Sequence, residues 1–418
     1  MIKNTEQKNC IAYLTGEYPR ASDTFIQREV TALRNLGATI LTCSIRRTGS
    51  EHHVGAEQQK EASNTFCVLE SIRNPFKLIW VHTKIAIANP RRWFSALMLA
   101  LQTRPPGLRN LIYQLFYFAE AGVLAEHLRT NSVTHLHNHF GNSSCSVAML
   151  SSEISGIPFS YTMHGPAIFF EPKHWRIDAK IARAQFVSCI SHYCRSQGML
   201  FAEPQFWPNM RIVHCGVELS RYGKVKSNSK NKHLLFVGRL APIKGVLLLL
   251  DAFTTLLETH PDTILTLVGD GPSRSELEAK VKLLGLQNKV IFTGYKSQNE
   301  VAALLSTTDI FVLPSFAEGV PVVLMEAMAS SVPVIAPHVA GVPELVEDGK
   351  SGLLVSPGDT RMLVSSLREL LNNPELQVKM GEAGRRKVEA EFDITKEAAW
   401  LLKLLNNNAP KDQLRPDS

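Results

Sequence analysis

Two glutamates, Glu318 and Glu326, stand with seven residues between them in the stretch AEGVPVVLMEAMAS, which spans residues 317–330. Pro321 suits the first turn of a helix, so we expect Glu318 in the preceding loop and Glu326 two turns inside the helix. Carboxylates accept hydrogen bonds, which suits Glu318 for sugar hydroxyls and Glu326 for the adjacent hydroxyls of a ribose. The alternative is a helix-capping Glu318 and an exposed Glu326, but Glu326 has apolar neighbours on every side.

A second group of polar residues follows an apolar strand in the stretch FVGRLAPIKG. Gly238 ends the strand, Arg239 follows it, and Lys244 stands at the start of the next helix. Free backbone N–H groups and the positive end of a helix attract anions, and two cations beside them suit a diphosphate. Gly319 would let a ligand approach the backbone, where the N–H of Val320 faces an anion. Taken alone, Arg and Lys near a helix start are more often solvated than engaged with a ligand.

A further glycine turn lies at Gly269–Pro272 in the stretch LVGDGPSRSELE. It lacks the G-x-G-x-x-G spacing, so the sequence does not support a dinucleotide site. We interpret it as a tight turn that leads into a helix started by proline.

Three histidines alternate in the stretch HLHNHF, where His135, His137 and His139 would share one face of a strand and could bind zinc. This is the less favoured interpretation, because neither a carboxylate nor a cysteine is spaced nearby. We expect His139 to line a cleft on the acceptor side instead. The chain also lacks any D-x-D pair of aspartates that could hold a metal on a diphosphate. We therefore expect no metal.

Short apolar strands alternate with helices along the chain, which is typical of parallel βα units with sheets covered on both faces. The stretch 220–232 is poor in apolar residues and rich in Lys, Ser and Asn, which indicates a linker. We predict an α/β protein of two Rossmann-like, doubly wound domains, residues 1–222 and 223–390. Residues 391–418 should form a C-terminal helix that packs back toward the N-terminal domain, and a disordered tail. Open sheets of this kind bind ligands at the carboxyl ends of their strands, here in a central cleft.

The composition of the chain argues against several classes of protein. The chain has 418 residues, 44% of them hydrophobic, which is ample for two cores. Its seven cysteines are scattered without C-x-x-C spacing, so we expect neither a disulfide framework nor a zinc knuckle, and a reducing cytosol fits best. The N-terminus lacks a signal-peptide pattern, and no run of 18 apolar residues occurs, so we expect no membrane span.

The charge is unevenly distributed. The formal net charge is +7, and residues 71–119 contain no Asp or Glu but seven Lys and Arg among aromatic and aliphatic residues. Such a mixture suits the anionic surface of a membrane. The alternative is a solvated helical face whose apolar side packs on the domain.

Taken together, these motifs resemble the retaining group 1 (family 4) glycosyltransferases of the GT-B fold. The resemblance rests on EGVPVVLMEAMA, VGRLAPIKG, GDGP, PSFAEG and GVPELVEDGKSGLLVSPGD, which follow the family's order over residues 233–372. The first half is similar to the family's colanic-acid or exopolysaccharide branch, in EYPRASDTFIQREV, HLHNHFG, YTMHGPAIF and IVHCGVE. One departure is that Gly16 stands alone where many members have a glycine pair.

The resemblance implies roles for individual residues. Arg239 and Lys244 would hold the nucleotide diphosphate, and Glu318 with the backbone of Gly319 and Val320 would hold the donor sugar. Glu326 would bind the ribose. The remaining residues with implied roles are His164 near the donor sugar, Gly16 and Gly238 on the donor side, and Tyr295 with Lys296 at the edge of the base.

The expected function is the metal-independent transfer of a hexose, with retention, from a UDP- or GDP-sugar to a glycan or lipid-linked acceptor in cell-surface polysaccharide biosynthesis. No other cofactor and no nucleic acid are expected. The protein should be cytoplasmic or peripheral on the inner face of the cell membrane. One alternative is a non-catalytic GT-B subunit that binds nucleotide sugar or polysaccharide. Another is a GT-B epimerase or phosphorylase, although no lysine surroundings typical of a pyridoxal site occur.

Overall fold

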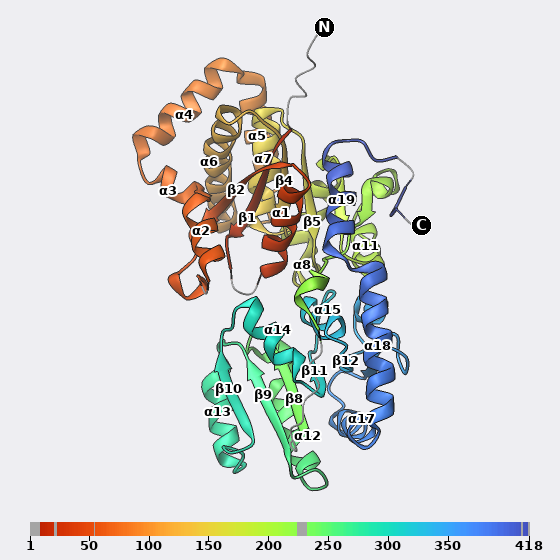
Figure 1. Ribbon diagram of the computed structural model, residues 1–418. Coiled ribbons are helices and arrows are strands. Elements are labelled where there is room, and N and C mark those ends of the chain that lie inside the picture. The colour runs from red at the N-terminus through yellow and green to blue at the C-terminus, as the bar shows by residue number, and fades with distance from the viewer. Residues whose placement is uncertain (1–8, 21–22, 54, 224–231, 411–412, 417–418) are drawn as a thin grey trace. The chain divides into compact units, whose positions relative to one another are not determined.

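Residues 9–20, 23–53, 55–223, 232–410 and 413–416 are described by the computed structural model of the chain (Figure 1). They form two compact units. Unit 1 comprises Met1–Arg20, Glu29–Val213 and Ala398–Ser418, and unit 2 comprises Ala21–Arg28 and His214–Glu397. The division falls after Val213 rather than after residue 222, and most of the expected linker lies outside the described residues.

Unit 1 is built on a parallel sheet of seven strands in the order β3-β2-β1-β4-β5-β6-β7. The strands are β1 (Cys10–Glu17), β2 (Thr39–Arg46), β3 (Phe66–Cys67), β4 (Val133–His139), β5 (Phe159–Met163), β6 (Val187–Cys189) and β7 (Met210–Ile212). Every residue of β5 and β6 is buried, as expected for strands covered on both faces. Gly16 lies near the end of β1 rather than in the loop after it.

The helices of the first half of the chain surround this sheet. They are α1 (Thr24–Asn35), α2 (Ala56–Asn64), α3 (Val68–Ile72), α4 (Pro75–Ala88), α5 (Pro90–Gln102), α6 (Leu108–Thr130), α7 (Ser143–Ser155), α8 (Ala167–Phe170), α9 (Pro172–Trp175), α10 (Ile177–Arg183) and α11 (His192–Met199). Helix α7 packs on β1, β4 and β5, and α5 and α6 pack on α7. Helix α4 packs on α5 and α6, which makes it the outermost layer on this side of the sheet (Figure 1).

Unit 2 has a parallel sheet of six strands in the order β10-β9-β8-β11-β12-β13. The strands are β8 (Lys232–Val237), β9 (Thr263–Val268), β10 (Val290–Gly294), β11 (Ile310–Val312), β12 (Val334–Pro337) and β13 (Leu353–Val355).

The helices of the second half of the chain lie between and after these strands. They are the 3-10 turn η4 (Pro242–Lys244) and helices α12 (Val246–Leu257), α13 (Arg274–Leu283), α14 (Gln298–Ser306), α15 (Val322–Ala329), α16 (Val342–Leu345), α17 (Thr360–Asn372), α18 (Pro374–Glu391) and α19 (Ile394–Leu405). Local signals explain their starts. Ser297 and Glu300 form a capping box at α14, and Asp359 caps α17.

The C-terminal segment is partly ordered where the sequence predicts a disordered tail. The backbone N–H of Ile212 donates to the carbonyl of Leu414 at 3.1 Å, and Trp400 Nε1 donates to the carbonyl of Ile212 at 3.0 Å. Strand β7 lies at the edge of its sheet, so its free backbone groups can be paired by a following segment. That pairing orders residues whose composition alone favours disorder.

Candidate functional site

In unit 2, β8 and β11 are neighbours at the point where the strand order reverses. Ligands of doubly wound sheets bind beyond the carboxyl ends of the strands at this position. Gly238 and Arg239 directly follow β8, and the segment from Pro314 to Glu318 follows β11. The sheet therefore brings the two predicted motifs to one edge, although they lie about 80 residues apart in the chain.

The two loops at this edge are joined through their backbones. The N–H of Phe316 donates to the carbonyl of Ile243 at 2.8 Å. Gly245 has φ +65°, and a Cβ built on it would lie 2.2 Å from the carbonyl oxygen of Pro314. Only glycine fits such a close approach in this conformation. The local packing thus fixes the position of Lys244 relative to the loop that carries Glu318.

The ammonium of Lys244 and the carboxylate of Glu318 form an ion pair, with Nζ 2.6 Å from Oε1. Their side chains are 22% and 8% exposed, so the pair lies at the edge of the protein interior. Glu318 does not cap α15, because Pro321 is the N-cap and no side chain bonds there. Arg239 is exposed, and no ion pair links it to another of the described residues.

The turn at Gly269–Pro272 packs against the loop that carries Arg239. The N–H of Leu240 donates to the carbonyl of Asp270 at 2.9 Å, and the N–H of Ser273 donates to the carbonyl of Leu240 at 2.9 Å. Gly269 has φ +123°, and a Cβ there would lie 2.0 Å from the carbonyl oxygen of Gly238. The predicted tight turn is present and holds the loop of Arg239 in place, but the helix after it begins at Arg274 with Ser273 as its N-cap, so Pro272 precedes the helix rather than starting it.

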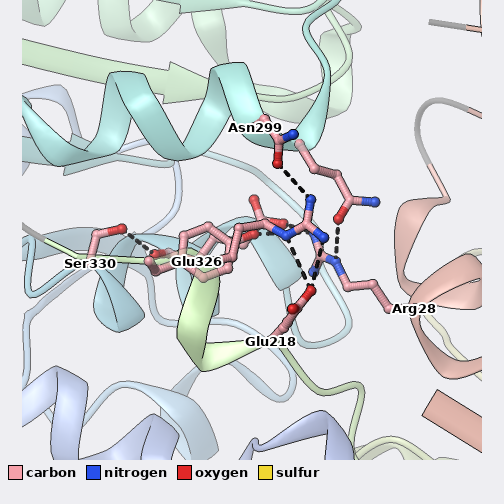
Figure 2. A network of polar contacts seen from close by, with 8 residues as sticks. Arg28, Glu218, Asn299, Glu326 and Ser330 are labelled. Carbon is pink, nitrogen blue, oxygen red and sulfur yellow. Dashed lines mark hydrogen bonds and ion pairs between the residues drawn. The ribbon is translucent and has the colours of Figure 1, made fainter. Parts of the chain in front are cut away.

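Glu326 lies inside α15 and is only 6% exposed. The alternative of an exposed charge is therefore wrong. Its carboxylate forms a buried ion pair with Arg28, which also donates from Nε to Gln298 Oε1 at 2.9 Å. Figure 2 shows Arg28 and Glu326 pointing toward one another, with Glu218 and Asn299 close by. A buried carboxylate needs such a partner, because removing charge from water is costly.

A chain of buried polar side chains occupies the corresponding edge of the sheet in unit 1. His139 is the last residue of β4, and His164 directly follows β5. His139 Nδ1 lies 2.9 Å from His164 Nε2, and His139 Nε2 lies 3.1 Å from Glu29 Oε1. The Tyr13 hydroxyl donates to the same carboxylate oxygen at 2.8 Å. His139 is 0% exposed, so it does not line a cleft as the sequence led us to expect.

Burial sets the protonation of this cluster. It lowers the pKa of His139 to about 3, and together with the neighbouring His139 it lowers the pKa of His164 well below its ordinary value. Burial also raises the pKa of Glu29. Both imidazoles are therefore neutral at physiological pH, and each carries one proton.

The zinc hypothesis can be compared with this geometry. His137, His139 and Glu29 offer ligand atoms within 4.8 Å of one another, whereas His135 does not belong to the group. However, His137 already bonds Ser160 Oγ through Nδ1 at 2.7 Å and Thr162 Oγ1 through Nε2 at 2.9 Å. The cluster is wholly buried, and its ring nitrogens and carboxylate already have hydrogen-bond partners. We interpret it as a hydrogen-bonded core rather than as a metal centre.

Comparison with known proteins finds a family model that matches the second half of the chain. The model of the family described as "Glycosyl transferases group 1" matches residues 222–387, which include Arg239, Lys244, Glu318 and Glu326. Over these residues the chain resembles the group 1 glycosyltransferases. The predicted resemblance is thereby confirmed.

Two curated relatives of this glycosyltransferase carry the same description, putative colanic acid biosynthesis glycosyltransferase WcaL. The protein of Escherichia coli is 35% identical over 207 residues, which cover 46% of this chain and 51% of the relative. The protein of Salmonella typhimurium is 25% identical over 426 residues, which cover 94% of this chain and 100% of the relative. The stronger match thus spans about half the length of its relative.

Solved structures confirm the fold of the glycosyltransferase. Anabaena HepE in complex with UDP-glucose superposes with a TM-score of 0.72 at 18% identity, and the match covers 95% of this chain and 99% of that one. At this identity the likeness concerns the fold alone. The predicted GT-B class, with two parallel-sheet α/β domains, is confirmed.

The residues expected at the base edge of the glycosyltransferase site lie after β10. Lys296 Nζ lies 2.8 Å from Glu300 Oε1 and forms an ion pair with it. Glu300 also belongs to the capping box of α14. Tyr295 is half-buried and follows Gly294, whose φ is +72°. In unit 1, a Cβ built on Gly16 meets no atom within 4 Å, so the space beside it is open. The roles of these residues remain predictions.

Sequence reasoning missed Arg28 and Glu29. Both lie in α1, where every residue from Ile26 to Val30 is buried, so this turn of the helix has no exposed side. Charges at such positions are rarely buried without a partner. That pattern was a usable signal, but the sequence does not reveal which partners the two residues have.

Proposed function

We propose that this glycosyltransferase moves a hexose, with retention and without a metal ion, from a UDP- or GDP-sugar to a glycan or lipid-linked acceptor in cell-surface polysaccharide biosynthesis. The observation that carries the proposal is the pairing of Lys244 with Glu318 beside Arg239, at the edge where doubly wound sheets bind ligands. The relatives named as colanic acid enzymes and the UDP-glucose bound to HepE agree with it.

The charges at this edge suit a departing nucleoside diphosphate. Arg239 and Lys244 supply two cations, and the backbone N–H groups before α12 and α15 add partial positive charge. Cations aimed at the position where negative charge develops stabilise the transition state. Glu318 is then left beside the sugar, where it accepts hydrogen bonds from hydroxyl groups.

The carboxylates of this site distinguish between two routes to retention. A double displacement needs a second carboxylate on the far face of the sugar, and the charge of Glu318 is already paired with Lys244. Attack by the acceptor on the same face, with its proton passing to the leaving phosphate, requires no such group. We therefore favour front-face transfer.

The test is to incubate the protein with UDP- and GDP-sugars and measure the release of free nucleotide, with and without lipid-linked acceptor. We expect release that requires an acceptor, persists in excess EDTA and gives a product with the donor's anomeric configuration by NMR. Loss of release in EDTA would contradict metal independence. Donor binding without release, under any acceptor tested, would favour the non-catalytic alternative.

We also propose that unit 1 docks on the anionic inner face of the cell membrane through helices α4–α6. Among the described residues, no helix is long and apolar enough to cross a bilayer. Apolar side chains instead lie exposed on these helices: Phe76, Ile79, Trp80, Ile87, Phe94, Leu108, Ile112, Leu115 and Phe116. We call these residues the apolar face.

The alternative, in which the apolar side of these helices packs on the domain, does not account for this face. Val81, Ile85 and Leu99 already fill the inward side of α4 and α5, so the exposed residues form a second apolar side. Phe76 is 82% exposed and Trp80 is 60% exposed, which is unusual for such large side chains. The helices therefore present apolar surface that the domain does not cover.

Basic groups accompany the apolar face. The seven cations of residues 71–119 are all exposed: Arg73, Lys77, Lys84, Arg91, Arg92, Arg104 and Arg109. Lys84 Nζ lies 5.1 Å from the ring centre of Trp80, and Arg109 lies 5.4 Å from that of Tyr113. Cations of this kind contribute about 1 kcal/mol each near an anionic lipid surface. Rings and cations together match the boundary between headgroups and acyl chains.

Changing Trp80 and Phe116 together to glutamate should abolish sedimentation with vesicles that contain anionic lipid. The double substitution removes two apolar side chains that would insert between the lipids. It also brings two negative charges to a negatively charged surface. The control is Leu283→Glu, at a position of unit 2 that is 86% exposed and lies outside the apolar face. Equal sedimentation of both variants, or of the parent protein with neutral and anionic vesicles, would contradict the proposal.

A further inference from the structure

A network of polar side chains surrounds Glu326 in unit 2 (Figure 2). Arg28 binds the Glu326 carboxylate through Nη2 and donates from Nε to Gln298 Oε1 at 2.9 Å. Nη2 also donates at 3.4 Å to the hydroxyl of Tyr222, which follows the 3-10 turn η3 (Leu219–Arg221) and bonds Glu326 as well. All of these residues belong to unit 2.

One N–H group of the Arg28 guanidinium is left over. The guanidinium is planar and rigid, so its bonds to Gln298 and Glu326 fix its plane. Arg28 is 7% exposed, and its Nη1 is buried without a hydrogen-bond partner among the described residues. A buried N–H without a partner is costly, so it marks a position where an acceptor is expected.

The carboxylate of Glu326 can accept further hydrogen bonds. An ionised carboxylate offers about four lone-pair sites, and the bonds from Arg28 and Tyr222 do not fill them. The ion pair therefore offers a donor on Arg28 and an acceptor on Glu326 to the same ligand.

The charges of the network favour an uncharged ligand group. Glu326 balances the positive charge of Arg28. Glu218, close by in Figure 2, balances Arg221, with 2.8 Å between Oε2 and Nη2. A phosphate would be attracted by Arg28 and repelled by Glu326. A hydroxyl both accepts and donates a hydrogen bond, so two adjacent hydroxyls match the donor and the acceptor of this pair.

We propose that Arg28 is a binding residue for the ribose of the nucleotide-sugar donor. Its Nη1 donates to one hydroxyl of the vicinal diol, and the Glu326 carboxylate accepts from the adjacent hydroxyl. The inference rests on the proposed function for the identity of the donor, and it adds a residue to the ribose contact that the resemblance implies for Glu326. Arg239 and Lys244 belong to the same unit, so the whole contact lies within unit 2.

Direct binding tests this role without turnover. Isothermal titration calorimetry gives Kd for UDP, for GDP and for their 2′-deoxy and 3′-deoxy forms. The parent protein should bind its ribonucleotide about 10- to 100-fold more tightly than either deoxy form, as expected for one hydrogen bond to a charged group. Arg28→Lys keeps the charge beside Glu326 but cannot reproduce the planar fork, so the preference over one deoxy form should fall to about threefold or less.

The control is Arg368→Lys in the same unit. Arg368 also has a buried N–H without a partner among the described residues, but it bonds the carbonyl of Thr255 at 3.2 Å and lies outside the network. This variant should keep both preferences. Equal binding of all three forms by the parent, or preferences that Arg28→Lys leaves unchanged, would overturn the role of Arg28 in binding.

A second variant covers the case in which Arg28→Lys does not fold. Gln298→Leu removes the acceptor of Nε and leaves the ion pair in place, so the guanidinium loses its fixed plane. The same preference should therefore fall in Gln298→Leu. A purely structural ion pair predicts that the preference stays as in the parent, and that result would overturn the proposal.

Kinetics give an independent measurement. A ribose contact is made equally in the ground state and in the transition state, so Arg28→Lys should raise KM for the donor about 10-fold and leave kcat within about threefold of the parent. A fall in kcat at unchanged KM would contradict a binding role.

The two proposals fail in different ways. If neither UDP nor GDP binds, the proposed donor and the role of Arg28 are both wrong. If a nucleotide binds with a preference that Arg28→Lys removes, but no sugar is transferred, the proposed function fails and the role of Arg28 stands. If transfer proceeds and Arg28→Lys keeps both preferences, the role of Arg28 fails and the proposed function stands.

Discussion

Lys244→Ala should lower kcat/KM for the nucleotide-sugar donor by about 10²–10³, the loss typical of removing one group that stabilises developing negative charge. The ammonium lies 2.6 Å from Glu318, at the edge where the loops after β8 and β11 meet. Its removal takes away one of two cations expected on the diphosphate and leaves an 8% exposed carboxylate without its partner. Initial rates of nucleotide release, measured over a range of donor concentrations, give the effect.

Two further variants define this result. Glu318→Gln preserves the volume of the side chain and removes its charge, so a fall of similar size would place both members of the pair in the reaction. Lys350→Ala removes an exposed lysine of the same unit that pairs with Glu347, and it should leave the rate unchanged. If Lys244→Ala retains a rate within about threefold of the parent, the diphosphate role is wrong, because such a change is below the loss of one charge-assisted bond.

Much of the fold could be predicted because its signals are local. In unit 2, each strand is a short apolar run that ends near Gly or Pro, and each helix begins close to a cap or a proline. The positions of Arg239, Lys244 and Glu318 at strand ends follow from the same pattern, since parallel strands place their carboxyl ends at one edge. The placement of these residues at one edge of the sheet could therefore be predicted from spacing, whereas their roles come from the resemblance and stay predictions.

The partners of the buried charged residues could not be predicted from the spacing of residues in the sequence. Glu326 pairs with Arg28, which lies 298 residues earlier in the chain, and His139 bonds Glu29 across 110 residues. Such pairs depend on the order of strands in the sheet and on the rotation of α1 about its axis. A single sequence contains the burial pattern of that helix, but it does not contain the identity of what lies opposite.

The exposed apolar face of α4–α6 shows the same limit. The basic, acid-free composition of residues 71–119 indicated two alternatives, because apolar residues at helical spacing occur both in buried and in exposed faces. Only packing distinguishes them: Val81 and Ile85 point inward, whereas Phe76 and Trp80 lie exposed on the same helix. The choice rests on three-dimensional contacts that spacing does not encode.

The buried histidines of unit 1 make its stability depend on pH. Burial lowers the pKa of His135 to about 4 and that of His139 to about 3, whereas an unfolded histidine titrates near 6.5. Burial, followed by neighbouring imidazoles, also lowers the pKa values of His137 and His164. Between the folded and unfolded values, the unfolded state binds more protons. The stability that these residues contribute is complete above about pH 6.5 and is lost as the pH falls.

Two buried carboxyl groups act in the opposite direction. Burial raises the pKa of Glu120 to about 7, and it also raises the pKa of Glu29, which faces Tyr13, His137, His139 and His164. A carboxyl group with a raised pKa stabilises the fold below its unfolded value, and that contribution is lost as the pH rises through the folded value. Burial also lowers the pKa values of His82 and His127. Six histidines thus oppose two carboxyl groups among the described residues of unit 1, so the net effect of acid should be destabilising.

The free energy of unfolding, measured by urea titration with tryptophan fluorescence, should therefore fall by about 2 kcal/mol or more between pH 7 and pH 5. Two variants should change this difference with opposite signs. His135→Gln removes one imidazole that binds a proton in the unfolded state but stays neutral in the folded state. The fall in the free energy of unfolding between pH 7 and pH 5 should therefore shrink by about 2 kcal/mol. Glu120→Gln removes a group that favours the fold in acid, so the fall in the free energy of unfolding should grow by a similar amount.

His174→Gln, at an exposed position of the same unit, is the control for removing an imidazole as such. If His135→Gln and Glu120→Gln change the acid loss in the same direction, burial does not govern the titration of this core.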